Sequence, residues 1–489
     1  MTTPSAEAAS PLSASDSREV APRHAAVIRL LLISAFVVIL NETIMGVAIP
    51  RLMASLGVDA VAAQWLTTAF LLTMAVVIPI TGFLLQRLHT RTIFVAAMTL
   101  FCLGTLVATL APGLPVLVIA RVIQASGTAI MLPLLMTTVM TLVPAESRGK
   151  TMGNIMIVIS VAPAIGPTVS GVVLSFLGWR AVFLVVLPIA LVTLLIGLRR
   201  MVDVGEPTRS PIDLLSVALS VVGFGGLVYG LSEIGAGGAS ALLPTWVPFV
   251  VGGLGIAVFV GRQLVLQRTD RALLDLRTFR SRTFTTASLI MMLMMATLLG
   301  SLTLLPIYMQ QVLHLSPLAT GLLLLPGGLT MGLLGPVVGR LYDRLGARAL
   351  LVPGTVVTSL ALWWSTLFDT TSPAWFVLGF HVLLSVGLAF VFTPLFTAGL
   401  GAVEPRLYSY GSAIFGSTQQ LAGAAGVALL VSVLSVGAAG LTASGANPVV
   451  ATAGGVHQAF VVAAVLSVLA IVAAFGMRTP SPAQEPVAH

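Results

Sequence analysis

The sequence contains very little charge for its length. Of 489 residues, only 8% are Asp, Glu, Lys or Arg, whereas 57% are hydrophobic, and the mean hydropathy is +1.06. Soluble domains carry about 25% charged residues, so this composition excludes a water-soluble globular chain. It favours an all-α polytopic membrane protein, because a helix satisfies its own backbone polar groups inside lipid.

Cysteine and catalytic motifs are also scarce. The single cysteine, Cys102, excludes an intramolecular disulfide. The segment "RGKT" (148–151) resembles the end of a phosphate-binding loop, but Pro144 stands where the first glycine is required. We find no nucleophile–base constellation and no metal-ligand spacing. The sequence therefore predicts no enzyme, no catalytic residue, no metal and no cofactor, and it favours transport driven by an ion gradient over transport driven by ATP.

Lysine is nearly absent, since Lys150 is the sole lysine among 24 basic residues. A net charge of +8 is typical of some nucleic-acid-binding proteins. Here, however, the arginines lie in short loops between apolar runs, which is a topology signal, so we expect no nucleic-acid partner. With the N-terminus inside, 21 of the 24 basic residues fall on the cytoplasmic side; Arg51 and Arg180 fall outside, and Arg121 lies within a span.

Fourteen apolar runs are long enough to cross a bilayer, which predicts fourteen spans with both termini in the cytoplasm. Polar tails are expected at residues 1–26 and 479–489, both disordered and cytoplasmic. The predicted runs are 27–49, 61–83, 92–111, 114–141, 152–175, 181–198, 213–234, 243–261, 285–308, 318–338, 349–367, 373–397, 411–437 and 456–477.

Two turns of the chain repeat each other. "GFLLQRLHTR" (82–91) aligns with "GRLYDRLGAR" (339–348), and both follow an even-numbered span, so they lie on one side of the membrane. Same side and same direction indicate a parallel repeat of two six-helix halves. Two six-helix halves alone would place the second copy between spans 8 and 9. It lies between spans 10 and 11, so two helices are inserted between the halves. We therefore expect an N-terminal half at 27–200, the two inserted helices with their linkers at 201–282, and a C-terminal half at 283–478.

These features together resemble the fourteen-helix drug:proton antiporters of the major facilitator superfamily. "RVIQASGTA" (121–129), "APAIGPTVSG" (162–171) and "WRAVFLVVLP" (179–188) are similar to family motifs in the same order. The resemblance implies the major facilitator fold in a bacterial inner (plasma) membrane. It implies export of amphiphilic small molecules, with protons as the coupling ion. Gln86 departs from the family, because the hairpin normally carries an acid there; the second copy keeps it as Asp343.

The stretch "ILNETIMG" (39–46) places an acid, Glu42, inside the first span, about 12 Å from its outer end at ~1.5 Å per residue. Arg121 lies at a similar depth in the fourth span. An ionised side chain at the bilayer centre costs roughly 2.5–3.5 kcal/mol on insertion scales. We therefore expect Glu42 to bind and release the driving proton, with Arg121 tuning its affinity. The alternative is a buried ion pair that only fixes helix packing.

Further residues are candidates by position. Gln124 and Thr128 follow Arg121 at helical spacing, as a cavity lining or as interhelical glue. Asp343 is expected to bond helix N-terminal amides or arginines and close the inner gate. The remaining candidates are, for the substrate cavity, Asn41, Gln64, Trp65, Gln310, Gln311 and Gln419, and for gating and helix packing, Gly82, Arg87, Arg91, Gly166, Pro167, Gly339, Arg344 and Arg348.

The resemblance implies a proton-coupled multidrug exporter working by alternating access, and we expect a monomer. Two other functions stay open at this stage. One is a specific metabolite or lipid exporter of the same fold. The other is a membrane receptor or scaffold that transports nothing, in which the intramembrane acid would be structural.

Overall fold

The computed structural model describes residues 22–58, 60–204, 213–235, 244 and 246–477. The predicted tails lie largely outside these ranges, although α1 begins at Pro22 and so includes the last residues of the segment expected to be a tail. The described part of the chain holds 14 helical segments long and apolar enough to span a membrane. It contains helices and turns but no strand. The all-α architecture with fourteen spans is confirmed.

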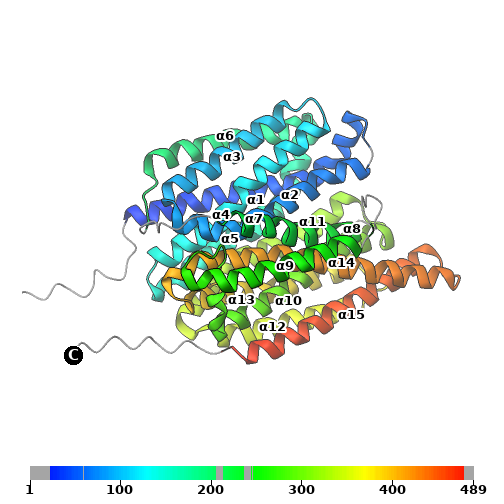
Figure 1. The fold of residues 1–489 in the computed structure, drawn as a ribbon. Helices are drawn as coiled ribbons and strands as arrows, with labels where there is room; N and C mark the ends of the chain where they lie inside the picture. Colours follow the sequence, from blue (N-terminus) through cyan, green and yellow to red (C-terminus); the bar gives the residue numbers. More distant parts are fainter. Residues whose placement is uncertain (1–21, 59, 205–212, 236–243, 245, 478–489) are drawn as a thin grey trace, which may run out of the picture.

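The N-terminal half consists of six helices, drawn from blue to cyan-green in Figure 1. Apolar residues continue around most of each helix, as expected for helices that contact both lipid and neighbouring helices. Their bounds are α1 Pro22–Leu56, α2 Ala60–Arg87, α3 Thr90–Leu110, α4 Leu114–Leu142, α5 Arg148–Phe176 and α6 Arg180–Arg200, with a short helix η2 at Ala145–Ser147.

The C-terminal half repeats this plan in yellow to red (Figure 1). Its helices are α10 Arg282–Ile307 with the π-helical end η6 Tyr308–Val312, α11 Pro317–Leu345, α12 Ala347–Ser365, α13 Ala374–Gly401, η7 Pro405–Leu407, α14 Tyr408–Ala443 and α15 Pro448–Phe475. The turns between α2 and α3 and between α11 and α12 lie on one side of the bundle, which we call the hairpin side.

The inserted pair supplies two spans. The first runs through α7 Leu214–Ser220, the π-helical segment η3 Val221–Gly225 and α8 Gly226–Gly235; the second is α9 Trp246–Leu266, followed by the short helices η4 Gln267–Thr269 and η5 Leu276–Arg280. In Figure 1 these green helices cross the front of the bundle between the two halves. α8 contacts α14 and α2, so the insert touches both halves.

The main contacts between the halves are made by α5 on α11 and by α2 on α14, and α4 also touches α14 while α5 also touches α13. Glycines allow the α5–α11 contact to be close. A Cβ at Gly153 would lie 2.3 Å from the carbonyl oxygen of Gly335, and a Cβ at Gly339 would lie 2.1 Å from that of Gly149. No larger side chain fits at these positions without moving the backbone, and small residues are what membrane helices use to approach closely.

A bidentate ion pair fixes the hairpin-side end of the inserted helices. Arg262 Nε and Nη2 donate to the Asp213 carboxylate at 2.6 and 2.7 Å. Asp213 also accepts a hydrogen bond from the Ser216 amide at 3.0 Å, which caps α7. These hydrogen bonds, from Arg262 above all, hold the pKa of the Asp213 carboxyl well below its usual range.

This pair predicts a pH-dependent stability. Because the folded pKa of Asp213 lies below the unfolded value near 4, the pair stabilises the protein above about pH 5, and that contribution is lost as pH falls through the folded pKa. We expect Arg262→Gln to lower the unfolding temperature of the detergent-solubilised protein at pH 7. The deficit relative to wild type should shrink steadily below about pH 4. Arg268→Gln is the control and should change little at either pH, because Arg268 is exposed in η4, directly after α9.

Candidate functional site

Arg121, at the centre of the N-terminal half, is held by groups other than Glu42. Its side chain is 2% exposed, Nη1 donates to Gln124 Oε1 at 3.1 Å, and Nε donates to the Leu66 carbonyl at 3.4 Å. The guanidinium carbon lies 4.0 Å from the centre of the Phe70 ring. A cation over an aromatic face inside a low-dielectric bundle is stabilised by the ring quadrupole. The arginine therefore has protein partners whatever the state of any acid.

Glu42 lies in the middle of α1 with a partly buried side chain. Its carboxylate and the Arg121 guanidinium interact electrostatically, but the two side chains are not in salt-bridge contact, which would require nitrogen and oxygen within 4.0 Å. The acid is thus near a fixed positive charge without being neutralised by direct contact. This arrangement allows a proton to be gained or lost without breaking an ion pair.

Polar and small residues surround Glu42 along α1. Asn41 is 1% exposed, and neither atom of its side-chain amide has a hydrogen-bond partner among the described residues. Thr43 bonds to the backbone of its own helix at Leu40, and a Cβ at Gly166 would come within 2.2 Å of the Thr43 hydroxyl. Gly166 therefore lets α5 pack closely on the turn of α1 that carries the acid. α5 stays helical through Gly166 and Pro167, and the Pro167 side chain lies outside the described residues.

The polar stripe that follows Arg121 on α4 is buried and hydrogen-bonded in this conformation. Gln124 is fully buried, and its Nε2 donates to Thr105 on α3 at 2.9 Å while its Oε1 accepts from Arg121. Thr128 is buried and donates to the Gln124 carbonyl at 3.0 Å. For Gln124 the structure favours interhelical hydrogen bonding, because its amide is paired with Thr105 of α3. The Thr128 hydroxyl bonds only within α4, so both alternatives stay open for it.

The other cavity candidates do not gather around Glu42 and Arg121. Trp65 stacks on Tyr229 of α8 with ring centres 6.1 Å apart. Gln310 and Gln311 are exposed in η6 at the end of α10, and Gln419 contacts the Met291 sulfur at 3.8 Å. The Gln64 side chain lies outside the described residues. The assignment of these candidates to a substrate cavity stays a prediction, and Gln310 and Gln311 lie at the end of their span.

The first hairpin-side corner, between α5 and α11, is closed by a carboxylate. Asp343 Oδ1 accepts from the Gly149 amide at 2.8 Å, and Oδ2 accepts from the Lys150 amide at 2.9 Å. Both amides belong to the first turn of α5, where unpaired N–H groups and the helix dipole favour an anion. The contact predicted for Asp343 with helix N-terminal amides is therefore present.

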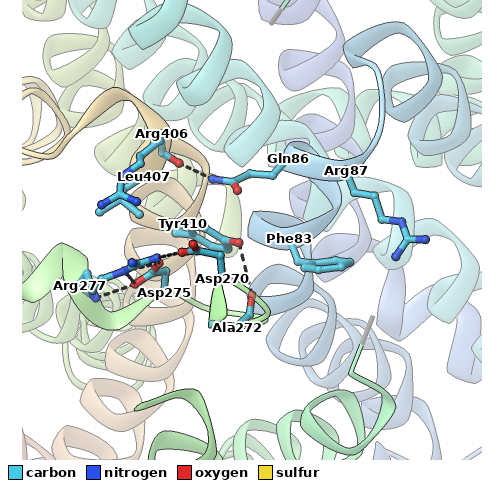
Figure 2. A pocket seen from close by; sticks show the side chains of 10 residues that line it. All are labelled: Phe83, Gln86, Arg87, Asp270, Ala272, Asp275, Arg277, Arg406, Leu407 and Tyr410. Carbon is cyan, nitrogen blue, oxygen red and sulfur yellow. Dashed lines mark hydrogen bonds and ion pairs between the residues drawn. The ribbon is translucent and has the colours of Figure 1, made fainter. Parts of the chain in front are cut away.

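The second corner, between α2 and α14, is closed without an acid on α2. Gln86, which aligns with Asp343, donates to the Arg406 carbonyl just before α14 (Figure 2). Gly82 lies against Ala413 and Tyr410 of α14. A cavity of about 220 Å³ remains at this corner. The two copies of the repeated turn thus make different contacts: one is a carboxylate on amides, the other an amide on a carbonyl.

The linker that follows α9 fills part of this second corner. Asp275 is 2% exposed and binds Arg277, whose Nε lies 2.8 Å from Asp275 Oδ2, and Arg277 also pairs with Asp270 (Figure 2). The Tyr410 hydroxyl donates to the Ala272 carbonyl at 3.4 Å. Hydrogen bonds from Arg277 hold the pKa of the Asp270 carboxyl below its usual value. The inserted helices are therefore attached to the start of α14.

The remaining hairpin arginines have separate places. Arg87 lines the corner cavity, 5.9 Å above the Phe83 ring. Arg91 joins α3 to the end of α6, because its Nη2 donates to the Leu198 carbonyl at 2.5 Å. Arg344 and Arg348 are exposed on the second hairpin. Sequence reasoning missed Asp270, Asp275 and Arg277, whose only signal was an acid–arginine alternation in the linker.

The comparisons with known proteins agree with this architecture. The family model described as Major Facilitator Superfamily matches residues 31–427. The chain belongs to the major facilitator superfamily. It is 40% identical to the uncharacterized MFS-type transporter YcnB of Bacillus subtilis, over 94% of this chain and 96% of the relative. It is therefore a multi-pass membrane transporter and not an enzyme.

Other relatives carry more specific names. The chain is 37% identical to the lincomycin resistance protein LmrB of Listeria monocytogenes, over 92% of this chain and 96% of the relative. It is 29% identical to the multidrug resistance protein B homolog of Mycobacterium tuberculosis, over 80% of this chain and 72% of the relative. The crystal structure of the human organic anion transporter MFSD10 (TETRAN) superposes with a TM-score of 0.64 at 16% identity, over 93% of this chain and all of that one, which shows a shared fold.

We predict that Asp343→Asn loosens the α5–α11 corner. Loss of the anion at the α5 N-terminus costs about 0.5–2 kcal/mol, or roughly a two- to thirtyfold rise in the population open on the hairpin side. Met156, which is 1% exposed beside Gly335, reports this opening when replaced by cysteine in a Cys102→Ala background. Labelling by a membrane-impermeant maleimide should become faster.

Arg340→Gln is the matched control for that experiment, because Arg340 is exposed on the same helix end and bonds only its own helix at Pro336 among the described contacts. It should leave the labelling rate at the wild-type value. Equal labelling in Asp343→Asn and wild type would mean that the carboxylate does not hold the corner shut.

We predict that Arg277→Gln destabilises the protein by about 3–5 kcal/mol, because it leaves the buried Asp275 carboxylate without its partner. Adding Asp275→Asn removes that charge and should recover most of the stability. Thermal unfolding in detergent measures both. A double variant no more stable than Arg277→Gln would show that the ion pair is not the source of the loss.

Proposed function

We propose that the protein is a proton-coupled exporter that moves neutral or monovalent cationic amphiphilic compounds by alternating access. The observation that carries this proposal is the placement of Glu42 close to Arg121 without direct contact. Arg121 keeps the Leu66 carbonyl and Gln124 as partners when Glu42 is neutral. Protonation of the acid therefore removes one charge without leaving a buried cation unpaired, whose desolvation is costly.

The names of the relatives support the export part of the proposal. Lincomycin resistance and multidrug resistance are phenotypes that export of the compound produces, and relatives with these names match over most of this chain. A single acid near the centre suits cargo with at most one positive charge, because a dication would need a second carboxylate to offset its desolvation.

The direction of the cycle follows from the charge distribution. We propose that the hairpin side faces the cytoplasm and that the membrane is the bacterial plasma membrane, because basic residues are concentrated on that side. In the described conformation, α5 packs on α11 and α2 packs on α14 at the two corners of this side. Protons would enter from outside and leave inside, which supplies about 1.4 kcal/mol per pH unit and about 2.3 kcal/mol per 100 mV for each proton.

The decisive test compares wild type with Glu42→Gln in inside-out vesicles that are acid inside. Lincomycin and tetraphenylphosphonium are added separately, and collapse of the proton gradient is recorded. We expect cargo-dependent collapse in wild type and its reduction to background in Glu42→Gln, because glutamine cannot carry a proton. Glu146→Gln, an exposed acid outside the spans, is the control and should behave as wild type.

Each other outcome has a distinct meaning. Equal collapse in wild type and Glu42→Gln would keep the exporter and move the proton site elsewhere. No collapse with either compound, in vesicles that contain folded protein, would contradict multidrug export and favour a specific metabolite or lipid as cargo.

A further inference from the structure

A second cavity lies away from the Glu42–Arg121 centre, inside the spans. It has a volume of about 260 Å³ and is enclosed by α2, the inserted helix α8, α10 and α14. Thr68 and Leu71 face it from α2, Val228 and Leu231 from α8, and Gln420 and Val427 from α14. We call it the α8 pocket. Because α8 belongs to the inserted pair, the two six-helix halves alone would leave this pocket without one wall.

The lining of the α8 pocket is uncharged and mostly apolar. None of the residues that face it is Asp, Glu, Lys, Arg or His. Glu233, a buried acid on α8, is next in sequence to Ser232 of the lining but does not line the pocket itself. An ionic ligand would lose its hydration here and gain no counter-ion, so the chemistry of the walls selects a neutral molecule.

One polar group in the pocket lacks a partner. The side-chain nitrogen Nε2 of Gln420 is buried and makes no hydrogen bond within the described part of the chain. Its neighbour Gln419, in contrast, donates to the Met291 sulfur. A buried amide donor that stays unpaired is unfavourable, and this cost is recovered when an acceptor is provided. The Gln420 side chain lines the pocket, so turning its amide toward the cavity would let this donor bond an oxygen of a bound molecule.

The α8 pocket shares a helical turn with the charged centre. The Leu66 carbonyl and the Phe70 ring of α2 hold Arg121 on one face. Thr67 and Thr68, which follow Leu66 directly, lie on the pocket face of the same turn. A molecule in the pocket would consequently contact the turn of α2 that positions the arginine, without contacting the arginine.

We propose that the α8 pocket binds a neutral, membrane-soluble molecule that has an apolar body and one hydrogen-bond-accepting oxygen, with Gln420 as the donor. The apolar lining takes up the body, because burial of apolar surface supplies the affinity, and the Gln420 amide orients it. This inference concerns binding and stands whether or not the proposed proton-coupled export is correct.

Benzophenone is a suitable probe, since it is two phenyl rings joined by one ketone. On irradiation its ketone removes a hydrogen from a nearby C–H bond, and the two resulting radicals combine into a C–C bond, which leaves an alcohol. The purified full chain in lipid nanodiscs is irradiated with increasing benzophenone, and labelled peptides are identified by mass spectrometry. We expect saturable labelling of the α8 and α14 peptides that contain residues 228–231 and 424–427.

Two variants test the pocket and its donor separately. Ala424→Phe fills the cavity and should abolish saturable labelling. Gln420→Leu keeps the side-chain size but removes the donor. It should raise the benzophenone concentration that gives half-maximal labelling by roughly two- to tenfold, as for the loss of one hydrogen bond. Val436→Phe adds the same bulk on a 75% exposed position of α14 and should leave labelling unchanged.

Contrary outcomes are clear. Non-saturable labelling spread over many helices in wild type and variants alike would reflect dissolved probe in lipid and would overturn the proposal. Equal half-saturation in Gln420→Leu and wild type would overturn the role of the donor. If Ala424→Phe does not fold, judged by gel filtration, Leu231→Phe on the opposite wall replaces it with the same expectation.

Discussion

The contact between α5 and α11 is the constraint on which the described conformation depends. Glycine backbones meet there at distances that exclude any Cβ, and Asp343 places its carboxylate on the first amides of α5. Both features need the two helices to stay in register. While they persist, the two halves stay packed together at this corner of the hairpin side. A transporter that alternates must break this contact in each cycle, so its strength sets how long the closed state lasts.

The repeat in sequence does not become a symmetric structure. Gln86 and Asp343 occupy equivalent positions, yet one donates a hydrogen bond to a carbonyl and the other accepts two from amides. A neutral amide makes a weaker contact than a carboxylate at a helix N-terminus. At the corner with Gln86, the linker carrying Asp275 and Arg277 adds contacts of its own to the start of α14.

Much of the architecture could be predicted from the sequence, because hydrophobic runs and arginine placement report directly on the bilayer. The contact of Asp343 could also be predicted, because the unpaired amides at a helix N-terminus favour a carboxylate. The role of Gln124 could not be predicted, because its spacing from Arg121 fits both a cavity lining and an interhelical bond. Its hydrogen bond to Thr105 on another helix decides between these two roles. For Gln310 and Gln311 the sequence leaves a related ambiguity: glutamine is tolerated equally at a span end and in a cavity, and composition does not distinguish the two.

The linker cluster and the α8 pocket were beyond prediction for a different reason. Both are formed by segments far apart in the chain, and the residues involved are ordinary in their local sequence. Only packing of the insert against both halves brings them together.

The inserted helices have a mechanical consequence. α8 touches α2 of one half and α14 of the other, while the linker after α9 is fastened to the start of α14. If the halves rotate about each other, as the proposed alternating-access cycle requires, the insert cannot follow both. It must slide along one of them, and the stacked rings of Trp65 and Tyr229 mark the surface on which it would slide. The insert would then connect the two halves along the line where they meet, and its length would limit how far they can separate.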